Sequence, residues 1–400
     1  MLIPADAVQS QPCLIKGSAV LHRSYTHVFH VAAQSVAATG RRGRKPRNPI
    51  PTPASIVTSP GSSEIQLATS AAQATSIDVP SITTAIYFLA PDIFSLTRLE
   101  LPRPDLPIAV DVYEQVGDVS RIRSIADKYF VAIHTWMPIV SKKGFRAYLL
   151  NPLARRRTEL YLLALCMKLS CTPAADFAEE GPENFSLYQT AKRFCSEVEA
   201  AGLLSIHCLQ AEVLIAIFEI GQAVYPAAYL TVGRCARYGT ALGYGDFGKT
   251  VNEHTKPNSS IDGEEGRRVW WGITMLDRYV NLSNPTRPLA IKNPGIDAEL
   301  PLDDDTWENS SSKSEECVQI SNGFTLKMGF FSRLAQATYL LGQAFDLLSS
   351  DSADATECLN ANQGAQLRRT LQALINIADE EASVRQLYIC AQSMSCFSSQ

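Results

Sequence analysis

From about residue 118 onward, apolar residues recur at intervals of three and four, the period of one face of an α-helix. The first run of this kind is expected to end at Pro138, and its apolar positions are Val119, Ile122, Ala126, Tyr129 and Ile133. A later run has the spacing of a seam along which one helix packs against another. Its positions are Phe331, Leu334, Thr338, Leu341, Phe345 and Leu348. The pattern therefore predicts amphipathic helices that pack together.

Further helices follow from the same period and from start and stop signals. We predict them over about 155–171, 186–201, 208–221, 226–242 and 263–282, with a last one from near Gly364 towards Gln400. The stretch 208–221 is apolar nearly all round, as expected of a central buried helix. Pro226 suits a first helical turn, and Asp262 with Glu265 forms a D-x-x-E start signal. No long stretch alternates apolar and polar residues, so the predicted fold class is all-α.

Ahead of the helical domain, which is expected to fill 118–400, composition separates two segments. Residues 1–85 are rich in Ser, Thr, Ala and Pro, which predicts a disordered, basic N-terminal arm and linker. Residues 86–117 contain four prolines and are expected to run extended. The net charge of −4 is uneven, because residues 1–63 carry seven Lys or Arg and one acid. A basic arm on an acidic body favours contact between the arm and a polyanion.

The ten cysteines include no C-x-x-C pair, and most lie within apolar helical stretches. We expect small buried side chains in a reducing compartment, with no disulfide framework and no structural zinc site. The longest apolar run, 213–218, is far shorter than the ~20 residues of a membrane span, so no membrane partner is expected.

The segment "GYGDFGKT" at 243–250 matches the phosphate-loop pattern, with Gly243, Gly248, Lys249 and Thr250 in the required places. Such a loop needs a buried strand before it and a helix after it. The preceding residues have a helical period and the following ones are polar, so we predict a helix stop at Gly243 or Gly245 and then a surface loop. A P-loop nucleotide-binding enzyme is the alternative that these flanks disfavour. No other catalytic pattern is present, and we expect the chain not to be an enzyme and to have no catalytic residues.

The most distinctive stretch is "RRVWWGITMLDRYVNLSNPTRPLAIKNPGIDAELP" at 267–301. It resembles the middle homology region of fungal binuclear zinc-cluster transcription factors, which carries an R-R-x-W-W helix, an L-D-R turn, a G-R-P loop and an I-D-x-x-L-P exit. Segments at 129–145, 187–194, 209–221 and 227–245 also resemble that region and follow its order, so the likeness covers roughly 118–350. The residues that match its motifs are Arg267, Arg268, Trp270, Trp271, Asp277, Arg278, Arg287 and Pro288.

These motif residues are interpreted as scaffold. Adjacent tryptophans on a helix point about 100° apart and fill two neighbouring gaps between helices. Arg267 and Arg268 are expected to pack their stems on those rings and to reach carboxylates or helix ends. Asp277 is expected to hold an arginine of a neighbouring helix. The alternative is that these side chains line an effector pocket.

The chain departs from the family pattern in its cysteines. The zinc cluster of the family needs six, and here only Cys13 precedes residue 166. No binuclear zinc site, and hence no cofactor, is expected in this chain. Whether the missing cluster is real or reflects an error in the gene model stays open, and relatives extend further at the C-terminus, which implies a shortened domain. The loop motif also has Thr286 in place of its glycine.

The cluster "RRGRKPR" at 41–47 is the candidate for DNA binding or nuclear import, through Arg41, Arg42, Arg44, Lys45 and Arg47. It resembles the basic tail that follows the zinc cluster in relatives. Five cations neutralise few phosphates, so any DNA binding is expected to be weak and sensitive to salt. By resemblance, the chain is a nuclear regulator of RNA polymerase II genes with a helical regulatory domain. The alternative is a sensor or dimerisation module that does not bind DNA and acts through a homo- or heterodimer with a related regulator.

Two smaller features are expected to carry no function. His22, His27 and His30 lack the further ligands of a metal site. "DDDTWE" at 303–308 is interpreted as a solvated loop, with a short acidic-aromatic activation element as the alternative.

Overall fold

The computed structural model is all-α, as predicted. It describes residues 79–97, 99–101, 104, 106–151, 157–172, 181–245, 260–284, 286–309, 318–323, 328–349, 362, 364–374 and 376. The helices are α2 Val79–Leu89, α3 Pro91–Leu96, α4 Val110–Val116, α5 Val119–Ala132, α6 Lys142–Leu150, α7 Arg157–Ser170, α9 Gly181–Ala200, α10 Ile206–Gly221, α11 Ala227–Ala241, α12 Ser260–Asn281, α13 Asp304–Asn309, α14 Ile320–Gly323 and α15 Phe330–Ser349. Residues 364–374 are also helical. The β-structure within these ranges is one antiparallel bridge between Glu299 and Gln319.

Helix α10 forms the centre of the core. Every residue from Cys208 to Ile220 is buried, including the carboxylates of Glu212 and Glu219. It packs against α7, α9, α11 and α12. A helix surrounded in this way needs apolar residues on all sides, which is why its sequence lacks the polar stripe of a surface helix.

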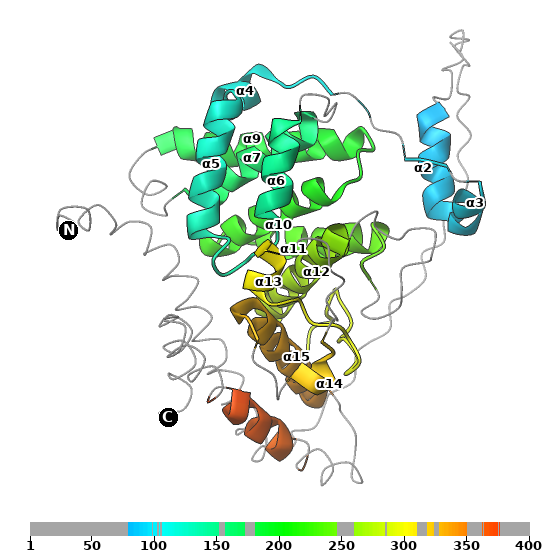
Figure 1. Ribbon diagram of the computed structural model, residues 1–400, viewed down its shortest axis with the longest axis vertical. Helices are drawn as coiled ribbons and strands as arrows, with labels where there is room; N and C mark the ends of the chain where they lie inside the picture. Colours follow the sequence, from blue (N-terminus) through cyan, green and yellow to red (C-terminus); the bar gives the residue numbers. More distant parts are fainter. Residues whose placement is uncertain are drawn as a thin grey trace, which may run out of the picture.

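Two groups of helices meet at α12 (Figure 1). Helices α4 to α7 and α9 lie on one side of α10, and α13, α14 and α15 lie beyond α12 on the other. The predicted seam lies on α15, where Phe331, Thr338, Leu341 and Phe345 are buried. Helix α12 therefore packs against α10 and α11 on one side and against α15 on the other.

The expectation of an extended segment over 86–117 is wrong. Helix α2 crosses the predicted boundary at residue 85, and α3 and α4 both lie inside the segment. Pro91 is the first residue of α3, a position where the missing N–H leaves no hydrogen bond unmade. Pro104 and Pro107 lie in the non-helical residues before α4. Proline therefore set the ends of helices here rather than excluding them.

Two helix boundaries near the core also differ from prediction, and one helix was not predicted. Helix α5 ends at Ala132, before Pro138, and α12 begins at Ser260, so that Asp262 lies inside it. The Glu265 carboxylate points into the core, where it accepts from the Ser141 backbone N–H at 2.8 Å and from Gln210 Nε2 at 2.7 Å. Helix α6 was not predicted, because its nine residues are too few for the period to stand out.

The apparent phosphate loop follows a helix and not a strand. Gly243 has φ 87°, its N–H donates to Thr240 O, and the Tyr244 N–H donates to Gly239 O. This is the Schellman pattern that ends a helix at a residue with positive φ, so the predicted helix stop is confirmed for α11. Lys249 and Thr250 lie outside the described residues.

Candidate functional site

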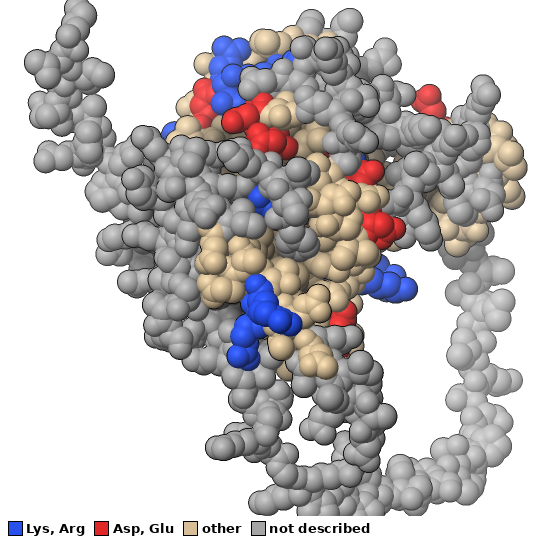
Figure 2. Space-filling view, turned by 60° about the horizontal axis from the view of Figure 1, so that its bottom comes forward, with Lys and Arg blue, Asp and Glu red and all other residues tan. Residues whose placement is uncertain are grey.

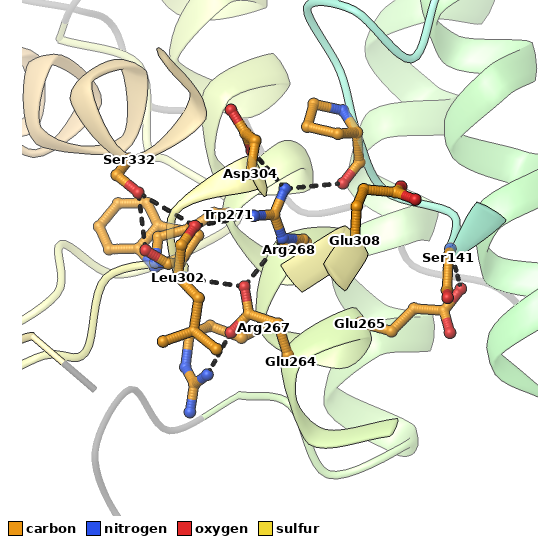
Figure 3. A network of polar contacts seen from close by, with 12 residues as sticks. Ser141, Glu264, Glu265, Arg267, Arg268, Trp271, Leu302, Asp304, Glu308 and Ser332 are labelled. Carbon is orange, nitrogen blue, oxygen red and sulfur yellow. Dashed lines mark hydrogen bonds and ion pairs between the residues drawn. The ribbon is translucent and has the colours of Figure 1, made fainter. Parts of the chain in front are cut away.

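The guanidinium of Arg268 is the centre of a buried polar network (Figure 3). The side chain is fully buried, and its Nε donates to Glu264 Oε1, one turn earlier on α12, at 2.8 Å. Its two terminal nitrogens donate to Asp304 Oδ1 at 2.8 Å and to the carbonyl of Leu302 at 2.7 Å. Arg268 therefore joins α12 to α13 and to the chain that leads into it.

Aromatic rings hold the same guanidinium from the sides. The Cζ atom of Arg268 lies 4.1 Å from the centre of the Trp307 ring on α13 and 5.5 Å from the centre of the Phe331 ring on α15. A guanidinium stacked on aromatic faces is stabilised most where water is excluded, as here. The expectation that Arg268 reaches carboxylates is confirmed by Glu264 and Asp304, and the rings that face its guanidinium are those of Trp307 and Phe331.

Arg267, Trp270 and Trp271 make the other contacts of this part of α12 with its surroundings. Arg267 forms ion pairs with Glu264 and with Glu299 Oε2, the latter at 2.6 Å. Trp271 is fully buried and donates from Nε1 to the Glu299 carbonyl at 3.0 Å. Trp270 is buried on another side, against Gly239 of α11. The two rings thus lie in different interfaces.

Asp277 and Arg278, nearer the C-terminal end of α12, hold the loop after that helix. The Asp277 carboxylate accepts from the backbone N–H groups of Ala290 at 3.2 Å and Ile291 at 3.1 Å. The expectation that it holds an arginine of a neighbouring helix is wrong, because its arginine is the adjacent Arg278, at 2.9 Å. Arg278 also donates to Asn293 at 2.6 Å, and Asn293 donates to the Gly342 carbonyl of α15 at 3.0 Å.

The remaining predicted residues lie apart from this network. Arg287 lies over the ring of Tyr229 on α11, 4.8 Å from its centre, and Pro288 is exposed. Arg41, Arg42, Arg44, Lys45 and Arg47 lie outside the described residues, as do His22, His27 and His30. On the face drawn in Figure 2, the charged side chains among the described residues lie in small separate groups.

An open hollow of about 660 Å³ adjoins the Arg268 network. Helix α6 and the turn before it form one wall, and α13 forms the other. Its lining residues are His134, Thr135, Pro138, Lys142, Lys143, Arg146, Asp304, Asp305 and Glu308. We call it the α6–α13 hollow. Asp304 belongs both to this lining and to the network, so the hollow and the buried arginine share a side chain.

His134 and Glu308 join the two walls. His134 Nε2 donates to Glu308 Oε1 at 3.2 Å, and its ring stacks on Trp307 at 6.1 Å between centres. Burial by itself would raise the pKa of the Glu308 carboxyl, but the hydrogen bond and charge of His134, with Lys142 and Arg268 nearby, hold that pKa below its ordinary value. Glu308 is therefore a carboxylate at neutral pH.

The interpretation of 303–308 as a solvated loop is wrong for most of it. Residues Asp304–Asn309 form α13, and Trp307 is buried. The run of acids conceals the helix in the sequence, because its charges are compensated by residues from distant parts of the chain. The lysines of α6 were not predicted as site residues, because the short helix that carries them was not predicted. The signal for that helix is "SKKGF" at 141–145, in which Ser141 is the N-cap.

The cysteines of the core offer no reactive site. Cys166, Cys195, Cys208 and Cys235 are buried, as predicted for cysteines in apolar helical stretches. Burial raises the pKa of these thiols, that of Cys208 to about 12. A thiol that stays protonated is neither a good nucleophile nor a metal ligand.

Within the described ranges, no three His, Cys, Asp or Glu side chains are grouped as a metal site requires. No helix in the part of the chain that the structure describes combines the length and the apolar character needed to span a bilayer.

Comparison with known proteins gives one family and several relatives. The model of the fungal specific transcription factor domain matches residues 126–379. Transcription factor BOA15 of Botryotinia fuckeliana is 37% identical over 157 residues, which are 39% of this chain and 84% of that protein. Transcription factor tazR of Aspergillus terreus is 25% identical over 51% of this chain and 32% of its own length. The pigment biosynthesis transcriptional activator pigB of Monascus ruber is 24% identical over 54% of this chain and 38% of its own length. No solved structure matches significantly.

Proposed function

This chain belongs to the family of fungal specific transcription factor domains, and on that premise we propose that it regulates transcription by RNA polymerase II in the nucleus. The described helices are the regulatory body. The observation that carries the proposal is the family match over 126–379, which spans α6 to α15 and the second half of α5. The three relatives are named as transcription factors or a transcriptional activator, which supports the same role here.

In this proposal the motif residues hold the regulatory body together and do not contact DNA. Arg268 and Arg278 are fully buried and paired within the protein, so neither is available to a phosphate. The face in Figure 2 also has no continuous basic patch among its described residues. The basic cluster at 41–47 is then the candidate for nuclear import or for weak contact with DNA.

A sensor or dimerisation module that acts through a related regulator is the second candidate. It is favoured by the single cysteine before residue 166, because the zinc module of the family needs six. The nucleotide-binding alternative loses its support, since Gly243 ends a helix.

A tethering experiment tests the proposal. The full chain is fused to a heterologous DNA-binding domain in a fungal host, and transcript from a reporter carrying the matching sites is measured. A regulator changes the transcript level relative to the DNA-binding domain alone, and equal levels would contradict the proposal.

The untethered chain then separates the two candidates. Binding to promoter DNA that weakens with salt, and that is lost when Arg41, Arg42, Arg44, Lys45 and Arg47 are all changed to Ala, assigns direct contact to the arm. Recovery of promoter DNA only in the presence of a related regulator assigns the partner route.

A further inference from the structure

Helices α2 and α3 lie outside the core of the regulatory body. Neither supplies a side chain to the hydrophobic clusters that the structure describes, and none of their described side chains is buried. In Figure 1 the two helices lie together beside the body, apart from the helices around α10. Tyr87 ties α2 to the body, because its hydroxyl donates to the Ala241 carbonyl at the end of α11. We call these two helices the α2–α3 pair.

The exposed apolar positions of the pair form a helical row. They step by three and four along the chain, and they are Ile82, Ala85, Leu89, Ile93 and Leu96. Leu89 is 84% exposed and Leu96 is 81% exposed. Apolar residues at this spacing share the face by which one helix packs against another. Because an isolated helix of 11 residues is marginal in water, α2 needs such packing for its stability.

The row carries almost no charge, which bears on what covers it. Asp92 is the only charged residue in 79–97. Residues 1–63 account for +6 of the total charge of −4, so the rest of the chain carries −10. Two copies of so acidic a body repel each other over most of their surface. They can approach most easily through a surface that is nearly uncharged, and charged residues are depleted at the centres of interfaces.

The apolar area of the pair is large enough for a contact between two chains. The exposed large side chains are Ile82, Phe88, Leu89, Ile93 and Leu96. They offer on the order of 500 Å² per copy, so two copies would bury on the order of 1,000 Å², the size at which specific interfaces begin. The pair contains no Lys or Arg, which an amphipathic helix uses to lie on an anionic membrane.

We propose that the α2–α3 pair is the contact between two copies of this chain, with the same row facing itself across a two-fold axis. Four helices then enclose the apolar side chains that one copy leaves in water. The contact follows directly after residue 78, so pairing puts two copies of the basic cluster at 41–47 on one assembly and doubles the cations available to DNA. The inference goes beyond the proposed function, because self-association needs neither a promoter nor DNA.

Sedimentation velocity of the full chain from about 1 to 100 µM tests the proposal. The mass of two chains is expected at the upper end, with dissociation on dilution. Leu89→Glu with Leu96→Glu sets like charges against each other and is expected to weaken association at least about 100-fold. The matched control is Val131→Glu with Leu150→Glu, two exposed apolar side chains of α5 and α6, and it is expected to stay within about twofold of the unchanged chain.

Opposite charges test whether the partner is a second copy. A chain with Leu89→Lys and Leu96→Lys, mixed with the chain that carries glutamates at both positions, is expected to restore the two-chain mass that neither forms alone. Urea midpoints of both leucine variants, measured at ~1 µM, are expected to match that of the unchanged chain, since neither leucine belongs to the core.

Four outcomes would overturn the proposal. They are the mass of a single chain at every concentration, a mass that rises without limit, undiminished association of the double-glutamate variant, and a mixture that stays unpaired. A tethered reporter that responds while the chain stays single would leave the proposed function intact.

Discussion

Replacing Arg268 with Met removes the central charge of the network while keeping an unbranched apolar stem. The side chain is fully buried and Glu264 is 2% exposed, so the carboxylate would stay in the core with one of its two arginine partners removed. Removing one member of a buried ion pair costs about 3–5 kcal/mol of unfolding free energy. Glu264 keeps its ion pair with Arg267 and the N–H of Leu302, which places the expected loss near the lower end, about 3 kcal/mol.

Urea denaturation followed by fluorescence and by circular dichroism measures this loss. Arg146→Met is the matched control, because its ion pair with Asp127 is exposed and is expected to contribute at most about 1 kcal/mol. The double variant Arg268→Met with Glu264→Gln removes both members of the pair and is expected to recover about 1 kcal/mol or more relative to the sum of the single changes. A loss for Arg268→Met no larger than for the control, or strictly additive effects in the double variant, would refute the reasoning.

Three further changes test other parts of the structure. Gly239→Ala brings a Cβ to 2.7 Å from the Trp270 ring of α12 and is expected to lower the free energy of unfolding by about 1–3 kcal/mol, as measured by thermal unfolding. The control Gly233→Ala, on the same helix as Gly239, meets open space and is expected to be neutral or slightly stabilising. Asp277→Asn leaves the buried Arg278 without the carboxylate beside it and is expected to lower the free energy of unfolding by about 3 kcal/mol. Because Asp277 also holds the loop after α12, proteolysis within 289–293 is expected to become faster, and unchanged cleavage there would count against the loop contacts. In the folded protein the pKa of Glu308 is lower than its usual 4.5, so the stabilisation that its carboxylate gives is complete above pH 4.5 and is lost as the pH falls below it. The urea midpoint, measured from about pH 5 to 3, is therefore expected to fall less for Glu308→Gln than for the unchanged protein.

The regular spacing of apolar residues in the sequence was sufficient to predict the long helices. The stretch at 208–221, apolar nearly all round, indicated a central helix, and α10 is buried from Cys208 to Ile220. The spacing at 331–348 indicated the seam on α15. These features are local, because they depend on which residues share one face of a helix, and a helix of several turns repeats that information often enough to be recognised.

Short helices carried too little repetition to be predicted. Helix α13 has six residues, five of them polar or acidic, and its one large apolar residue, Trp307, gives no period. The nine residues of α6 begin with two lysines. Both form the walls of the α6–α13 hollow, so the hollow was not predictable either.

By itself, the sequence determined the fold class, the positions of the long helices and the family motif at 267–301. Only the tertiary structure decided the partners of the motif charges. Arg268 meets Asp304 and the aromatic ring of Trp307 because α13 packs beside α12, and Asp277 meets the backbone at 290–291 because the chain turns back there. The physical reason is that a buried charge must be paired wherever the packing places a partner, and the spacing of residues along one helix contains no information about which other segment lies opposite.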